Sequence, residues 1–175
     1  MKSLFESILG VCYYESPMEI NILFDEGLEG CLDRDWLQDI AKQALTAQGI
    51  GNDIEMGLVI ASQQRVHELN KTYLGRDEPT DVLSFAMLSE SSTEQRESFA
   101  TPPDGVKHLG EVIICYQRAA TQAAEHRHSI KREIAILIIH GILHLLGYDH
   151  GEPEPTREMK DREAAILKTV EGELD

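Results

Sequence analysis

Alternating apolar and polar residues near the start of the chain predict a first strand. Ile20, Ile22 and Phe24 alternate with Glu19 and Asn21 in the first part of this segment, which is the period of a strand with one buried face. Either Asp33 or Asp35 can cap a following helix whose apolar residues recur at helical spacing. Residues 56–61 then form a second apolar run, which predicts a second strand.

The pattern continues through the rest of the chain. Residues 89–105 are polar and rich in Ser, Glu and Pro, so we expect a long loop there. The remaining predicted elements are strands at 82–88 and 109–115, a helix after Ser62, and helices at 117–126, at 129–146 and after Pro155, the last burying Met159, Ile166 and Val170.

The order of these elements predicts an α+β fold. We expect a single domain in which a mixed four-stranded sheet is packed with about five helices. The first two connections are strand–helix–strand units and predict parallel pairing, whereas the third and fourth strands are expected to be antiparallel. We place this domain at residues 18–175. Residues 1–17 join no pattern and form an N-terminal extension, either a flexible arm or the result of an upstream start.

Composition narrows the functional classes. The chain has 175 residues with 16 Lys and Arg against 31 Asp and Glu, a net charge of −15, which argues against sequence-independent DNA binding. No apolar run approaches the roughly 20 residues of a membrane span. Three scattered cysteines fit no disulfide framework, and the first residues do not resemble a secretory signal. We therefore expect a cytoplasmic location.

A group of histidines in the predicted helix at 129–146 carries the chemistry. His140 and His144 are four residues apart and so lie on one face of the helix. Gly147 is placed to end the helix, which lets His150 turn back toward them. Three imidazoles with an open fourth position are typical of a catalytic zinc site. The spacing equals that of the metzincin proteases, but Gly141 stands where their general-base Glu would be.

The stretch from His140 to His150 resembles the signature H-G-x-L-H-L-x-G-Y-D-H of the YbeY family. Two further segments, 69–85 and 109–115, are similar to the family's L-N-x-x-Y-R-x-x-D-x-P-T-[DN]-V-L-S-F and L-G-D-[IL]-V-I-C. Members are bacterial endoribonucleases specific for single strands that act in ribosomal RNA maturation. The resemblance implies one zinc ion held by His140, His144 and His150, although imidazole also suits nickel and other divalent metals.

The same resemblance implies a function and partners. It indicates a zinc-dependent endoribonuclease of 16S ribosomal RNA 3′-end maturation and ribosome quality control. Its partners would be single-stranded RNA, ribosomal proteins or a ribosome-associated GTPase, with no membrane and no DNA. Two alternatives stay open: a ribosome-associated metal-binding factor with little catalysis, and, less favoured, a metallopeptidase that takes its base from elsewhere.

One departure from the family pattern concerns RNA binding. The family usually has Arg at the position of Leu74, and Arg76 follows two residues later. Arg76 is therefore a candidate substrate-binding residue, with a solvated surface arginine as the alternative. No residue is assigned a catalytic role: a structural and a functional reading both apply to Asp81, Ser84, Glu111, Tyr148 and Asp149.

The acidic excess is uneven along the chain. Residues 57–151, which contain all three motifs, carry 9 basic and 12 acidic residues, so most of the net charge lies outside them. Within this segment the sequence suggests a cluster of basic residues that would favour a small positive cleft for RNA: Arg118, Arg127, Lys131 and Arg132.

Overall fold

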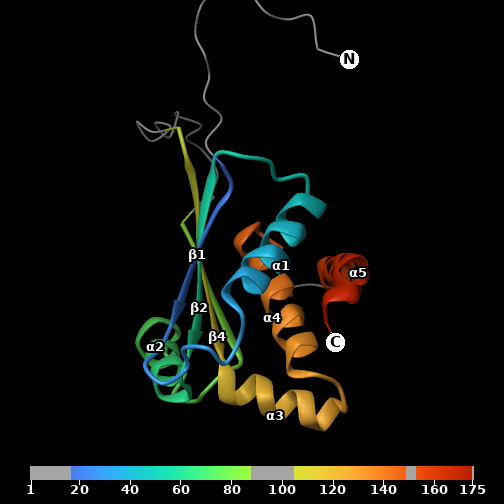
Figure 1. The fold of residues 1–175 in the computed structure, drawn as a ribbon. Coiled ribbons are helices and arrows are strands. Elements are labelled where there is room, and N and C mark those ends of the chain that lie inside the picture. Colours follow the sequence, from blue (N-terminus) through green and yellow to red (C-terminus); the bar gives the residue numbers. More distant parts are fainter. Residues whose placement is uncertain (1–16, 88–104, 149–152, 175) are drawn as a thin grey trace, which may run out of the picture.

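The computed structural model describes residues 17–87, 105–148 and 153–174. The predicted extension at 1–17 and loop at 89–105 therefore lie almost wholly outside the described residues. The elements along the chain are β1 (Glu19–Phe24), α1 (Arg34–Ala47), β2 (Ile54–Ala61), α2 (Gln63–Leu74), β3 (Val82–Ala86), β4 (Lys107–Cys115), α3 (Tyr116–His126), α4 (Ile130–Leu145), α5 (Pro153–Val170) and a short 3₁₀ turn at Glu171–Glu173 (Figure 1).

The four strands form one mixed sheet in the order β1-β2-β4-β3. β1, β2 and β4 are parallel, and β3 is an antiparallel edge strand. Successive residues of a strand face opposite sides of the sheet, so Val112 of β4 belongs to one apolar core and Ile113 to the other. The predicted α+β class, the mixed sheet and the antiparallel β3–β4 pair are confirmed.

The prediction that the connection through α2 gives parallel strands is wrong. β4 lies between β2 and β3, and β3 runs antiparallel to it. Val82, the first residue of β3, pairs with Ile114 at the carboxyl end of β4, and β2 finishes at the same end of the sheet. The connection through α2 therefore begins and ends at one end of the sheet. A turn after α2 makes this possible: Gly75 has a φ of +68°, and the Asn70 side chain donates to the Glu78 carbonyl at 2.7 Å.

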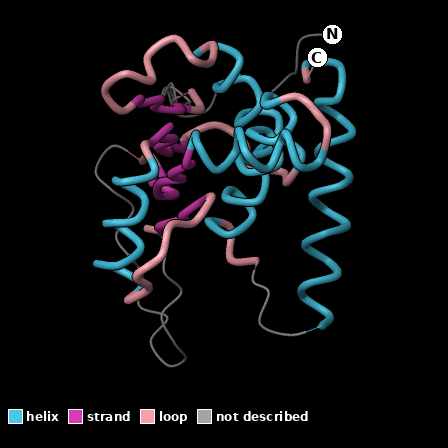
Figure 2. The backbone as a smooth tube through the Cα atoms, turned by 90° about the horizontal axis from the view of Figure 1, so that it is seen from below, coloured by secondary structure: helices cyan, strands magenta, loops and turns pink. Residues whose placement is uncertain are grey.

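Helices cover both faces of the sheet (Figure 2). α2 packs on one face, over a small core that includes Val59, Val66 and Ile113. α4 packs on the other face and contacts β3, β4, α1, α3 and α5. The larger core on this side is continuous from β1 to α5, where Met159, Ile166 and Val170 are buried as expected. α4 is therefore the central helix of the molecule, which explains why its sequence from Ile134 onward is apolar apart from Gly141 and the two histidines.

Two further features bear on the composition. Within the described residues, none of the helices combines the length and the apolar character needed to cross a bilayer. Cys31 and Cys115 are free thiols. Burial raises the pKa of the Cys115 thiol above its usual value, so this side chain is an inert part of the core rather than a reactive group.

Candidate metal centre

α4 begins and ends where its sequence directs. The Ser129 hydroxyl caps the first turn by accepting a hydrogen bond from the Arg132 N–H at 3.1 Å. At the other end, the N–H of Gly147 donates to the His144 carbonyl and the N–H of Tyr148 to the Leu143 carbonyl, both at 3.0 Å. This pair of bonds is a Schellman motif, and Gly147 has the positive φ of +91° that the motif requires.

His140 and His144 meet on one face of α4, one turn apart. Their Nε2 atoms lie 3.1 Å from each other, and the ring planes cross at 74° with centroids 4.7 Å apart. Two imidazole nitrogens bound to one tetrahedral zinc ion at the usual bond length would be separated by about 3.4 Å. The two rings therefore already have almost the separation of a pair of metal ligands, and the donor set fits such an ion.

A carboxylate from α5 fixes the orientation of the first ring. Glu163 Oε1 lies 2.5 Å from Nδ1 of His140. An ionised carboxylate can only accept, so Nδ1 carries the proton and Nε2 of the neutral ring keeps its lone pair toward His144. Carboxylates commonly orient metal-binding histidines in this way. Glu163 also lines a surface hollow of about 250 Å³ between α4 and α5, together with Ile139 and Lys160.

Glu163 was not among the residues that the sequence pattern singled out. A signal was present, because Glu163 follows Met159 by four residues and precedes Ile166 by three, so it interrupts the buried stripe of the last helix. A carboxylate in such a stripe needs a partner, and only the packing of α5 on α4 shows that the partner is His140. His150 and Asp149 lie outside the described residues, and the third ligand therefore stays a prediction.

Gly141 faces the sheet and not the histidine side of the helix. A Cβ at this position would lie 2.5 Å from Cγ1 of Val112 and 3.2 Å from the Ser84 hydroxyl. The same hydroxyl donates to the Gly141 carbonyl at 3.2 Å. Glycine is thus required for the close approach of α4 to β4 and β3. A protease-type Glu at this position would collide with the sheet, which is the physical reason for its absence.

The other candidates have structural surroundings. Asp81 accepts hydrogen bonds from the Val82 N–H at 2.9 Å and from the Gln122 amide at 3.0 Å, so it caps a turn. Glu111 lies on the face of the sheet opposite α4, beside Gly57. Tyr148 packs against the main core, and the guanidinium of Arg162 lies 4.8 Å from its ring centroid. Ser84 lies next to the histidine turn of α4, because its hydroxyl is hydrogen-bonded to the carbonyl of Gly141, which follows His140.

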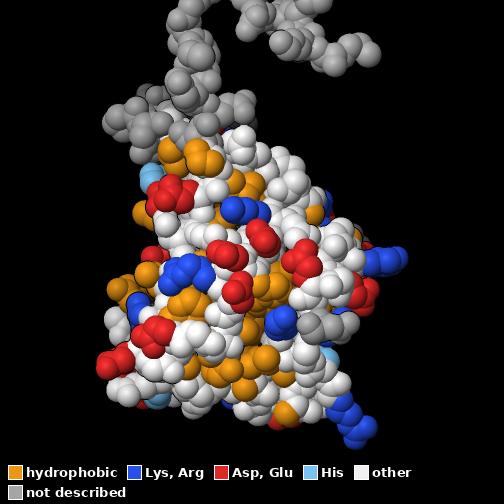
Figure 3. Space-filling model, in the orientation of Figure 1, with side chains coloured by type: hydrophobic (Ala, Val, Ile, Leu, Met, Phe, Trp, Pro, Cys, Tyr) orange, Lys and Arg blue, Asp and Glu red, His pale blue; other side chains and the backbone are white. Residues whose placement is uncertain are grey.

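Two of the four basic residues that the sequence singled out lie at the start of α4. Arg132 is paired with Glu171 at 3.4 Å, and the amine of Lys131 lies 5.9 Å from the Trp36 ring centroid. Both are at the start of α4, about 12 to 14 Å along the helix axis from His140. These two basic residues therefore lie away from the histidine pair along α4, and the predicted positive cleft for RNA stays a prediction. In the view of Figure 3, acidic and basic side chains are intermixed across the surface.

Arg76 and Leu74 are both exposed, at and just beyond the end of α2. α2 covers the sheet face opposite α4. Among the described contacts, none joins the Arg76 side chain to the histidines of α4, so its assignment to substrate binding stays a prediction.

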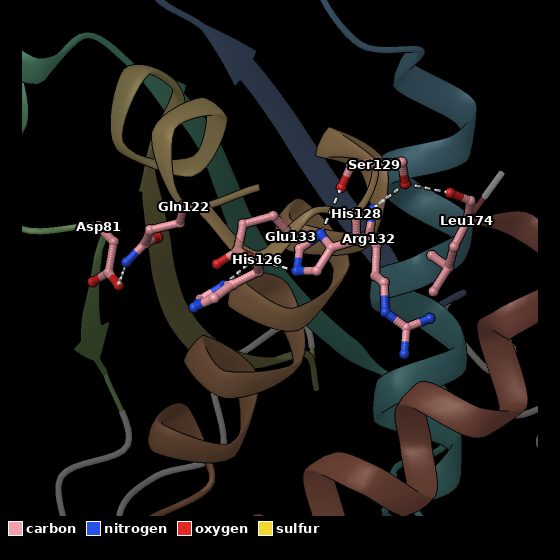
Figure 4. A network of polar contacts seen from close by, with 8 residues as sticks. All are labelled: Asp81, Gln122, His126, His128, Ser129, Arg132, Glu133 and Leu174. Atoms are coloured by element: carbon pink, nitrogen blue, oxygen red, sulfur yellow. Dashed lines mark hydrogen bonds and ion pairs between the residues drawn. The ribbon is translucent and has the colours of Figure 1, made fainter. Parts of the chain in front are cut away.

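A second group of ligand-type side chains lies at the start of α4. Ligand atoms of His126, His128 and Glu133 are all within 4.8 Å of one another (Figure 4). None of these three residues was predicted from the sequence as a ligand. A signal was present in the His-x-His spacing, which is followed by a carboxylate five residues later.

Together these features define a class: an α+β protein with a metal-type histidine pair on the central helix beneath a mixed sheet. Comparison with known proteins gives the family. Residues 30–171 match the family model described as Endoribonuclease YbeY, and the chain belongs to the YbeY endoribonuclease family.

Individual relatives agree with this assignment. The chain is 43% identical over 160 residues to a protein of Dehalococcoides mccartyi named Endoribonuclease YbeY, covering 90% of this chain and 93% of the relative. A relative of the same name from Roseiflexus castenholzii is 42% identical over 137 residues, 78% of this chain and 82% of the relative. A solution structure from Thermotoga maritima matches with a TM-score of 0.56 and 27% identity, covering 88% of this chain and 90% of that one.

Proposed function

We propose that this protein is a zinc-dependent endoribonuclease that cleaves single-stranded RNA and acts in 16S ribosomal RNA 3′-end maturation and ribosome quality control. Its metal ligands are His140, His144 and His150. The cellular location is the cytoplasm, and the partners are ribosomal RNA together with ribosomal proteins or a ribosome-associated GTPase. Membership of the YbeY family supports the RNA substrate.

The observation that carries the metal assignment is the geometry of the histidine pair. Nε2 of His140 is 3.1 Å from Nε2 of His144, and its Nδ1 is held by Glu163. Without a metal or a proton between them, two lone pairs would face each other at this distance, which is unfavourable. Imidazole donors suit zinc, nickel and copper, and zinc is the ion that the family resemblance implies.

The residues of this chain have separable roles in that reaction. His140 and His144 hold the ion, His150 completes the set, and Glu163 keeps the His140 ring in one orientation and one tautomer. Gly141 keeps the helix against the sheet, so the site has no base at the position that proteases use. A bound divalent ion would supply polarisation of a phosphoryl oxygen and a more acidic water.

The test is RNA cleavage by purified protein without a tag, compared with His144→Ala. A single-stranded RNA and its duplex are the substrates, and elemental analysis gives the metal content of each preparation. We expect the wild type to cleave the single strand and contain metal, and His144→Ala to lose both. His67→Ala is the matched control, because His67 is an exposed histidine paired with Asp77 at 2.8 Å on α2.

Two results would redirect the proposal. Equal residual cleavage by wild type and His144→Ala would indicate a contaminating nuclease and favour a ribosome-associated metal-binding factor, a reading that the exposed Leu74 in place of Arg keeps open. Full metal content in His144→Ala would refute the ligand assignment. Product ends separate the chemistry: a 2′,3′-cyclic phosphate indicates attack by the 2′-hydroxyl, and a 5′-phosphate with a 3′-hydroxyl indicates attack by water.

A further inference from the structure

The corner between α3 and α4 brings three ligand-type side chains together. His126 is the last residue of α3, His128 precedes the capping residue of α4, and Glu133 is in the first turn of α4. Arg127 between the two histidines has a φ of +57°. This left-handed residue reverses the chain, so both histidine side chains lie toward Glu133 (Figure 4).

One oxygen of the Glu133 carboxylate, Oε2, is buried without a hydrogen-bond donor. The residue is 4% exposed, and its Oε2 accepts no hydrogen bond. Its ion-pair contacts among the described residues are with His128 Nε2 at 3.1 Å and His126 Nδ1 at 3.7 Å. A buried acceptor left without a donor is costly and rare in folded proteins. The site therefore calls for a positive charge that the carboxylate can bind.

The hydrogen bond of His128 sharpens this requirement. Its Nδ1 lies 3.1 Å from the Ser129 carbonyl oxygen, which can only accept, so Nδ1 carries the proton. The neutral ring then presents the lone pair of Nε2 to a carboxylate oxygen 3.1 Å away. Two acceptors at this distance repel each other unless a cation lies between them. That cation is either a second proton on the ring or a metal ion.

The distances favour the metal. Ligands of a tetrahedral zinc ion at the usual bond lengths are about 3.4 Å apart, and the two contacts of Glu133 Oε2, at 3.1 and 3.7 Å, fall on either side of this value. Lone pairs of two metal ligands converge on a point away from the line that joins them, whereas a hydrogen bond needs its proton near that line. The close contact without a hydrogen bond fits the metal geometry.

We infer that His126, His128 and Glu133 form a second site for a divalent transition metal of the zinc type. The ligand atoms are Nδ1 of His126, Nε2 of His128 and Oε2 of Glu133. His126 has a side chain that is 61% exposed, so the fourth position is open to water. The site is seven residues before His140 on α4, about 10 Å along the axis, and its role is to fasten the α3–α4 corner.

The experiment counts metal in a background without the first site. The full chain without a tag carries His140→Ala and His144→Ala, is dialysed to equilibrium against zinc and is analysed for bound metal. We expect one equivalent of zinc in this background. Adding His126→Ala or Glu133→Gln removes it. Adding His108→Ala leaves it, because His108 is a histidine paired with Glu55 at 2.7 Å in a two-residue contact.

His126→Ala keeps the result interpretable. The side chain is exposed, so its removal leaves the core intact, and an unchanged far-UV spectrum verifies the fold. Zinc should also raise the thermal midpoint of the background but not that of the His126→Ala variant, since only a bound ligand stabilises the native state. A background that binds no zinc, or zinc retained after His126→Ala, overturns the inference. Neither result bears on RNA cleavage or on the His144 site.

Discussion

Glu163 holds the ring of His140 by its Nδ1 atom at 2.5 Å, while Nε2 of the same ring faces His144. The carboxylate belongs to the last helix and the histidines to the central one. The packing of α5 on α4 therefore does more than complete the core, because it also sets the tautomer and orientation of a metal-type ligand.

Glu163→Ala should weaken zinc binding by about 10- to 100-fold, the usual effect of removing a group that orients a metal-binding histidine. Affinity is measured by competition with a chromophoric chelator. The matched control is Glu158→Ala, since Glu158 is on the same helix and pairs at the surface with Arg162 at 2.9 Å. Equal affinity of Glu163→Ala and the control would show that the contact does not support the metal.

Gly141→Ala should destabilise the fold by roughly 1 to 3 kcal/mol, because the new Cβ would lie 2.5 Å from Cγ1 of Val112. Urea unfolding gives the free energies. Adding Val112→Ala makes room for this Cβ, so the cost of Gly141→Ala should shrink in the Val112→Ala background. Gly51→Ala is the control, since a Cβ there meets nothing within 4 Å. Additive effects of the two substitutions would contradict the steric account.

Asp25 should make stability depend on acid pH. Burial raises the pKa of its carboxyl, but hydrogen bonds from the Ser62 N–H at 2.8 Å and from Arg65 at 2.5 Å outweigh burial and bring the pKa below the usual 3.8. The ionised form is therefore favoured in the native state. Its stabilisation is complete well above pH 3.8 and is lost as the pH falls through the lower native value.

The comparison is wild type against Asp25→Asn in urea unfolding from pH 7 to pH 3. We expect the variant to be less stable by about 1.5 to 3 kcal/mol at pH 7, the range for a hydrogen bond to a charged group, and the difference to narrow below pH 4. A difference that is constant over this range would mean that the native pKa of Asp25 is not lowered.

Arg76→Ala tests the predicted phosphate contact at the end of α2. If Arg76 binds an RNA phosphate, its removal should weaken RNA binding and reduce the slope of log affinity against log salt by about one. Fluorescence anisotropy with a single-stranded RNA at several salt concentrations measures both. Lys71→Ala is a nearby control, because Lys71 is paired with Asp77 at 2.8 Å. An unchanged slope would identify Arg76 as a solvated surface residue.

The local pattern of the chain determined most elements and one half of the site. Alternation at Ile20, Ile22 and Phe24 gave β1, and Ser62 and Ser129 cap the helices that follow them, because strand period and capping depend on neighbouring residues alone. The four-residue spacing of His140 and His144 likewise places both rings on one helix face whatever surrounds it.

Tertiary structure decided what depends on residues distant in sequence. β3 is antiparallel because the connection through α2 begins and ends at one end of the sheet. The sequence could not decide this, because the same strand–helix–strand pattern also allows a crossover to a parallel strand. Glu163 reaches His140 only because α5 packs on α4, and Gly141 must be glycine only because Val112 lies beneath it. His126, His128 and Glu133 converge through one left-handed residue at Arg127. Such contacts are set by packing between elements, which the periodicity of a single element cannot encode.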